Sequence, residues 1–251
     1  MKQSLLLLCL LLLLTPVLRA QSSSDIHLKV YDQALERGDV NAAVIAVQYI
    51  IAEGKAEGNW EDTLARLYFS AGQYPLARKI SEKLLRTDPK NVPMLTIAAF
   101  SNKALGQAKE AIPLFEVLYQ ESKYPGNLYE LITLQFALKR YGEAAENIEA
   151  LLKDPKAGEI KTTIQVGNNP PQEVALNAAA LNIKGVIALE MGNKEDAERI
   201  FAEALEIMPD FVLAKQNMAV LQATKDKQEE ETPATDAPES GKGKSKSKKR
   251  K

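Results

Sequence analysis

The chain has 251 residues, with 32 Lys and Arg, 33 Asp and Glu, one His and one Cys. A single histidine, His27, and a single cysteine, Cys9, exclude most zinc sites and argue against cysteine–histidine and serine–histidine catalytic pairs, which need a nitrogen base beside the nucleophile. We therefore expect no enzyme, no cofactor and no metal site.

The net charge of −1 hides an uneven distribution of charge along the chain. Residues 25–224 contain 21 basic and 27 acidic residues, whereas seven of the last ten residues are basic. The sequence therefore predicts an acidic body that carries a basic tail.

Residues 1–20 predict a secretory signal peptide. Lys2 precedes an apolar run from Leu5 to Leu14, and the small residue Ala20 precedes a polar run. The apolar run is shorter than the roughly 20 residues that span a bilayer, and Pro16 follows it. We therefore expect cleavage after Ala20 and export to the periplasm or cell envelope. Secretion from the cell and an uncleaved membrane anchor are the alternatives.

The central part of the chain is built on a repeat of 34 residues. Glycines recur at this spacing, each followed five residues later by an alanine, and the series resumes after a longer interval: Gly38, Gly72, Gly106 and Gly192, with Ala43, Ala77, Ala111 and Ala197. Glycine suits the left-handed position that ends a helix, and alanine allows two helices to approach closely. Such helix pairs are too thin to bury their own apolar faces, so neighbouring pairs must stack.

The clearest copy of the repeat is 178–211. Apolar residues at helical spacing predict a first helix that Gly192 ends and a second helix that Asn193 caps and Pro209 ends. The pattern resembles the tetratricopeptide repeat at its signature positions, which are Leu181, Gly185, Ala197, Phe201, Ala204 and Pro209. This resemblance implies an all-α fold, a right-handed superhelical solenoid of helix hairpins.

The resemblance extends over residues 24–224. We expect five repeats, at 24–57, 58–91, 92–125, 126–155 and 178–211, followed by a capping helix at 212–224. In the fourth repeat Arg140 stands where the glycine is expected, and the second helix fits better when shifted by one residue, with Tyr141, Ala144, Ile148 and Leu151 on its apolar face.

An insertion at 156–176 separates the fourth and fifth repeats. Lys161–Val166 alternates and is rich in β-branched residues, and Gly167–Pro171 is rich in turn-forming residues. The pattern leaves open a small β-hairpin and a long ordered loop. In either form the insertion is a candidate binding element, because insertions in repeat proteins often map to the binding face.

Residues 225–251 contain almost no apolar side chains, so we expect a disordered tail. Seven basic residues lie near its end: Lys242, Lys244, Lys246, Lys248, Lys249, Arg250 and Lys251. In an exported protein they favour binding to an anionic lipid surface or envelope polymer over binding to nucleic acid. A tail that only improves solubility is the other interpretation.

The resemblance implies that the first helices of the repeats line a concave groove, which binds a protein or a peptide. The corresponding positions are Asn59, Asp62, Arg66 and Phe69 in the second repeat, Thr96, Phe100 and Lys103 in the third, and Asn182, Val186 and Glu190 in the fifth. Cytosolic members that clamp a C-terminal carboxylate use paired Lys and Asn, and Asp62 departs from that pattern.

The leading hypothesis is an exported interaction scaffold that binds its partner in this groove and acts in envelope assembly or maintenance. A peripheral binder that uses the basic tail on an anionic surface is the alternative. An intracellular adaptor associated with nucleic acid is a third interpretation, and it requires that the leader is not cleaved.

Overall fold

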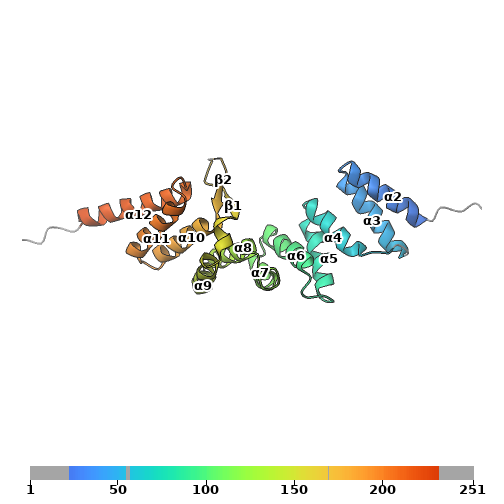
Figure 1. Ribbon diagram of the computed structural model, residues 1–251, viewed down its shortest axis with the longest axis horizontal. Coiled ribbons are helices and arrows are strands. Elements are labelled where there is room, and N and C mark those ends of the chain that lie inside the picture. The colour runs from blue at the N-terminus through green and yellow to red at the C-terminus, as the bar shows by residue number, and fades with distance from the viewer. Residues whose placement is uncertain (1–22, 55–56, 169, 232–251) are drawn as a thin grey trace, which may run out of the picture. The chain divides into compact units, whose positions relative to one another are not determined.

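A computed structural model describes residues 23–54, 57–168 and 170–231 of the chain (Figure 1). This part contains eleven α-helices, one short 3₁₀ helix and a two-stranded sheet. The chain divides into two compact units, 1–147 and 148–251, and the division falls within α9 (Tyr141–Leu152). Each unit is described by itself.

The first unit is a series of antiparallel helix pairs, as the repeat predicts. Its helices are α2 (Ser23–Glu36), α3 (Val40–Glu53), α4 (Trp60–Ser70), α5 (Tyr74–Leu85), α6 (Val92–Ala104), α7 (Ala108–Ser122), α8 (Pro125–Ala137) and the first half of α9. From α2 to α8 each helix packs on the next along the chain, and α4 also packs on α6. The predicted all-α architecture of stacked helix pairs is therefore confirmed.

The regular glycine spacing arises from the way in which the first helix of each pair ends. Gly38, Gly72 and Gly106 have φ values of +68°, +70° and +72°, in the left-handed region that glycine adopts without steric cost. The amide N–H of the residue that follows each glycine donates to a carbonyl of the preceding helix, as from Gln73 to Tyr68 O at 2.8 Å. The glycine therefore reverses the chain, so that the second helix can pack on the first.

The fourth repeat differs from the expectation by one residue. The left-handed position is occupied by Lys139, with φ +58°, and not by Arg140. Helix α8 begins at Pro125, 33 residues after Val92 begins α6, so the helix and the left-handed position that follows it are displaced together by one residue. The shifted pattern of the second helix agrees with this arrangement, because Ala144, Ile148 and Leu151 are all fully buried.

Lys139→Gly is expected to stabilise the protein by about 1 kcal/mol, because a lysine in the left-handed region is strained whereas a glycine is not. Thermal unfolding followed by circular dichroism at 222 nm measures the change, with Lys153→Gly as the control at a position without positive φ. If Lys139→Gly lowers the melting temperature as much as the control does, the assignment of Lys139 to the strained left-handed position is contradicted.

The core of the first unit combines small residues at the helix crossings with large residues between the pairs. Ala43, Ala77 and Ala111 are fully buried at the equivalent position of the second helix in three successive repeats. Phe115, one turn after Ala111 on α7, is also fully buried and meets the Phe100 ring edge-on, with ring centroids 5.0 Å apart. Small side chains bring the helix axes together, and aromatic side chains exclude voids between neighbours.

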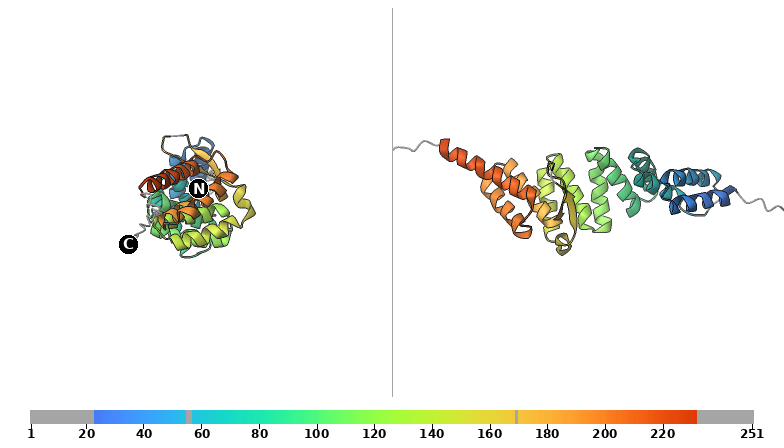
Figure 2. Two further views of the ribbon diagram at one scale, coloured as in Figure 1. Left: turned by 90° about the vertical axis from the view of Figure 1, so that its left-hand side faces the viewer. Right: turned by 90° about the horizontal axis from the view of Figure 1, so that it is seen from above.

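The second unit contains the end of α9, the 3₁₀ helix η1 (Pro155–Gly158), β1 (Lys161–Ile164), β2 (Gln172–Ala175), α10 (Leu176–Glu190), α11 (Lys194–Ile207) and α12 (Val212–Glu231). Figure 2 shows α10, α11 and α12 lying against one another. Within the α10–α11 pair, Phe201 lies so close to Gly185 that a Cβ atom at position 185 would be 2.5 Å from the ring.

The insertion forms the β-hairpin, which settles the choice between hairpin and loop. Its strands are antiparallel, with Lys161 opposite Ala175 and Ile164 opposite Gln172. Side-chain contacts hold the hairpin against the start of α12: Gln172 Nε2 donates to Asp210 O at 2.8 Å, and Gln172 Oε1 accepts from Val212 N at 3.0 Å. The second bond also satisfies an N–H of the first turn of α12, which has no partner within the helix.

Helix α12 continues to Glu231, seven residues beyond the expected end of the capping helix at Thr224. This corrects the expectation that the chain is disordered from residue 225. Lys, Gln and Glu are good helix formers, so they extend a helix that packing has already nucleated. The predicted signal peptide and the seven basic residues from Lys242 to Lys251 lie outside the described residues. Among the helices that are described, none is both long and apolar enough to cross a bilayer.

Candidate functional site

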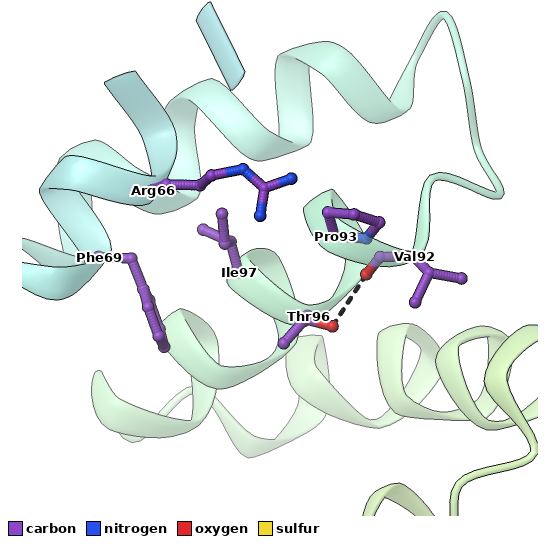
Figure 3. A pocket seen from close by; sticks show the side chains of 6 residues that line it. All are labelled: Arg66, Phe69, Val92, Pro93, Thr96 and Ile97. Atoms are coloured by element: carbon purple, nitrogen blue, oxygen red, sulfur yellow. Dashed lines mark hydrogen bonds between the residues drawn. The ribbon is translucent and has the colours of Figure 1, made fainter. Parts of the chain in front are cut away.

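A pocket of about 370 Å³ lies between α4 and α6, the first helices of the second and third repeats (Figure 3). It is entirely within the first unit. Its lining consists of two residues of α4 and four of α6: Arg66, Phe69, Val92, Pro93, Thr96 and Ile97. Three of these six, Arg66, Phe69 and Thr96, are among the groove residues that the resemblance to the tetratricopeptide repeat implies.

The walls of the pocket are mainly apolar. Ile97 is almost completely buried, while Phe69 is half-buried and packs edge-on against Tyr74, with ring centroids 5.7 Å apart. Pro93 is exposed in the first turn of α6, where a missing N–H costs little. The Thr96 hydroxyl donates to Val92 O at 2.9 Å, so its proton is satisfied within the helix (Figure 3).

Arg66 is the charged residue of the pocket, and its side chain extends from α4 over the cavity towards Ile97 and Pro93 (Figure 3). Asp62 lies one turn earlier on the same helix face, but the two side chains form no ion pair. Among the described residues Arg66 has neither a hydrogen-bonding nor an ionic partner for its guanidinium group. Lys103, by contrast, is neutralised by an ion pair with Glu130. The pocket therefore combines an apolar surface with an uncompensated positive charge.

The other predicted residues of the first unit lie outside this pocket. Asn59 occupies the N-cap position of α4, with an exposed side chain that makes no capping bond, and Asp62 is half-buried in the first turn. Phe100 packs on the core at Phe115, and Lys103 Nζ lies 6.0 Å from the centre of the Phe100 ring. Phe100 and Lys103 therefore have intramolecular partners that Arg66 lacks.

In the second unit, α12 removes one predicted position from solvent. Asn182 is only 4% exposed, and its Oδ1 accepts from Asn217 Nδ2 at 2.9 Å. Asn182 therefore joins α10 to α12 and is inaccessible to a partner in this arrangement. Val186 is half-buried, and Glu190 is exposed at the end of α10.

Three lining residues, Val92, Pro93 and Ile97, were absent from the predicted groove set. A signal was present in the sequence for one of them, because Pro93 follows the predicted Asn59 by one repeat length of 34 residues. Ile97 belongs to the buried apolar pattern of α6, which gives no indication that its edge reaches a cavity.

A second hollow, of about 360 Å³, lies among α7, α8 and the part of α9 in the first unit. Its lining is mainly polar and acidic: Glu116, Tyr119, Gln120, Leu131, Gln135, Glu143, Glu146 and Asn147. Several of these side chains bind one another, since Asn147 Nδ2 donates to Gln135 Oε1 at 2.8 Å and Gln135 Nε2 donates to Glu143 Oε2 at 3.4 Å. Its polar groups serve largely to join α8 to α9.

The single histidine and a buried tyrosine are both engaged in contacts within the fold. His27 Nδ1 lies 3.1 Å from Glu53 Oε1, and its ring stacks on Tyr49. Burial, with a smaller contribution from the charge of Glu130, raises the pKa of Tyr129 to about 12, so this phenol stays neutral at physiological pH. Within the described ranges, no three His, Cys, Asp or Glu side chains are grouped so as to hold a metal ion.

Comparisons with known proteins agree with this geometry. Residues 178–211 match the family profile of the tetratricopeptide repeat. The fold is that of a tetratricopeptide-repeat protein. No curated protein is significantly similar in sequence to this chain.

Solved tetratricopeptide structures resemble the chain at low sequence identity. YrrB, described as a tetratricopeptide protein with an unusual peptide-binding site, is 16% identical, with a TM-score of 0.60, covering 82% of this chain and 94% of YrrB. A tetratricopeptide repeat protein from Parabacteroides merdae is 18% identical, with a TM-score of 0.59, covering 83% and 75%. The MamA protein is 17% identical, with a TM-score of 0.58, covering 73% and 91%. At these identities the likeness shows the fold.

Proposed function

We propose that this tetratricopeptide-fold chain is an exported interaction scaffold that binds a peptide segment of a protein partner in the pocket between α4 and α6. The observation that carries the proposal is the coincidence of apolar walls with the unpartnered Arg66 on an exposed first-helix face. Binding sites typically combine a mainly apolar lining with a few polar groups that orient the ligand. The peptide-binding site named for YrrB supports the same use of the fold.

The size of the pocket suits anchor side chains rather than a whole ligand domain. Its volume of about 370 Å³ lies at the lower end of the roughly 300–1,000 Å³ typical of ligand sites. In protein interfaces a few buried anchors supply most of the binding energy, and the surrounding contacts exclude water. Phe69 and Arg66 are of the residue types that fill this role.

Photocrosslinking tests the proposed site. Replacing Phe69 with p-benzoylphenylalanine in cells that express the chain is expected to yield a defined adduct, identified by mass spectrometry. The control carries the same photoreactive group at Tyr49, an aromatic residue that is 55% exposed and does not line the pocket. We expect no such adduct at position 49, and a loss of the adduct at position 69 when Arg66→Glu is added. Equal adducts at both positions would contradict a groove site.

Export to the cell envelope is part of the same proposal, and it rests on the leader-like residues 1–20. N-terminal sequencing of the mature protein is expected to begin at Gln21, and cell fractionation to place the protein in the envelope or periplasm. An intact N-terminus in a cytosolic fraction would overturn the proposed compartment, while the photocrosslinking result would still decide the groove.

A further inference from the structure

We infer that the pocket between α4 and α6 selects a peptide in which an aspartate or glutamate side chain lies close to a bulky apolar side chain. The inference rests on the proposed function and adds the chemistry of the ligand. Arg66 supplies the charged contact, and Phe69, Pro93 and Ile97 supply the apolar contact.

The anionic part of the ligand follows from the surroundings of Arg66. Among the described residues it is the one charged residue that lines the pocket, and no carboxylate of that part of the chain pairs with it. The planar guanidinium group presents donors in a fork that matches the two oxygens of a carboxylate. Arg66 is exposed in the free protein, and a ligand side chain seated against the apolar walls beside it would exclude part of the surrounding water, which strengthens a charge-assisted hydrogen bond.

The apolar part of the ligand follows from the rest of the pocket lining, which comes from both α4 and α6. Phe69 and Pro93 remain partly accessible beside the buried Ile97, and the Thr96 hydroxyl donates its proton within α6. A polar ligand group placed against these walls would lose hydrogen bonds to water and gain few in return, whereas an apolar side chain gains from the exclusion of water.

The carboxylate is assigned to a side chain rather than to the end of a peptide. A clamp for a C-terminal carboxylate relies on several donors, but in this structure Lys103 is already paired with Glu130, and Asp62 places a negative charge one turn from Arg66. A single free cation is sufficient for one flexible acidic side chain.

The separation of the two ligand groups follows from helix geometry. Packed helices lie about 8–10 Å apart, and successive residues of an extended peptide advance by about 3.3–3.6 Å. Because Arg66 belongs to α4 and Pro93 to α6, the acidic and the apolar residue are expected within about three positions of each other.

Selection from a random peptide library displayed on phage tests this inference with the full mature chain as bait. Fusion of the peptide C-terminus to the coat protein removes free C-terminal carboxylates from the library. We expect enrichment of Asp or Glu within three residues of Leu, Ile, Phe or Trp. Enriched sequences are then synthesised with amidated ends, and their affinities are measured by fluorescence polarisation.

Charge exchange identifies the contact. Changing the acidic residue of the peptide to its amide, or Arg66→Glu in the protein, is expected to weaken binding at least tenfold. A peptide with Lys in place of its acidic residue is expected to recover binding to the Arg66→Glu protein. Arg37→Glu makes the same charge change at an exposed residue that does not line the pocket, and we expect it to leave the affinity unchanged.

The outcomes separate this inference from the function on which it rests. In one outcome the enriched peptides contain no excess of acidic residues, bind the Arg66→Glu protein normally and lose binding to the Phe69→Ala protein. This outcome would overturn the inference but not the proposed peptide-binding function of the pocket. Each enriched peptide is also synthesised with a free C-terminal carboxylate. Binding that is at least tenfold tighter in that form and that no longer depends on the acidic side chain would also overturn the inference. A failure to enrich any peptide that depends on Phe69 or Arg66 would overturn both proposals. Circular dichroism checks that each variant remains folded.

Discussion

Phe115→Ala is expected to lower the free energy of unfolding by about 3–5 kcal/mol, the range measured for aromatic residues removed from protein cores. The Phe115 side chain has 0% exposure, and it meets the Phe100 ring edge-on at 5.0 Å. Ala111, one turn earlier on α7, is also fully buried, and its methyl group is too small to fill the cavity that loss of the Phe115 ring would leave. The loss therefore combines the transfer energy of the ring with an unfilled void.

Urea unfolding followed by circular dichroism measures this loss, and Phe69→Ala is the matched control. Phe69 is half-buried at the pocket, so its replacement should cost clearly less stability than that of Phe115. Peptide binding should show the reverse order. Phe69→Ala is expected to weaken binding more than Phe115→Ala does, because Phe69 lines the pocket and Phe115 does not. A cost below about 1 kcal/mol for Phe115→Ala would be inconsistent with a tightly packed core.

Gly185→Ala is expected to destabilise the protein by about 1–3 kcal/mol, even though alanine is the better helix former by about 1 kcal/mol. The added Cβ atom would lie 2.5 Å from Cε1 and 2.7 Å from Cδ1 of Phe201. The Phe201 ring is fully buried and has no free space into which to move. Relief of the clash therefore requires α10 and α11 to separate, which weakens the packing of the whole pair.

The same substitution at Gly142 provides the control. Gly142 also lies in a helix, but a Cβ atom there would meet nothing within 4 Å. Gly142→Ala is therefore expected to stabilise the protein by about 0.5–1 kcal/mol. Thermal unfolding of the two variants should give shifts of opposite sign. A stabilising shift for both would show that Gly185 is not needed for the approach of the two helices.

The repeat architecture was predictable because its signals are local in the chain. Apolar residues at intervals of three and four, the glycines that adopt positive φ and the prolines near helix ends each act within one helix or turn. The displaced fourth repeat shows the limit of spacing arguments. Lys139 occupies the left-handed position despite its side chain, because the start of α8 and the buried face of α9 together set the register.

The sequence could not decide between a β-hairpin and an ordered loop for the insertion, for a physical reason. Alternation and turn residues favour two strands, but an isolated hairpin is marginally stable in water. In this fold the hairpin is held by packing on α10, where Val174 is fully buried, and by the contact of Gln172 with Asp210 and Val212, which are 38 and 40 residues further along the chain. The end of α12 was misplaced for the converse reason, because helix propensity alone carries the helix beyond its last described apolar contact.

The sequence by itself determined the period of the repeat, the helix pairs and the residues that belong to the face of each first helix. Only the tertiary structure decided which of those residues are free to bind. Arg66 has no partner among the described residues and lies beside apolar walls, whereas Lys103 is neutralised by Glu130 and Asn182 is enclosed by its bond to Asn217. Those partners come from the next helices of the stack, 27 and 35 residues away, so the availability of a side chain depends on packing between repeats and not on the repeat pattern.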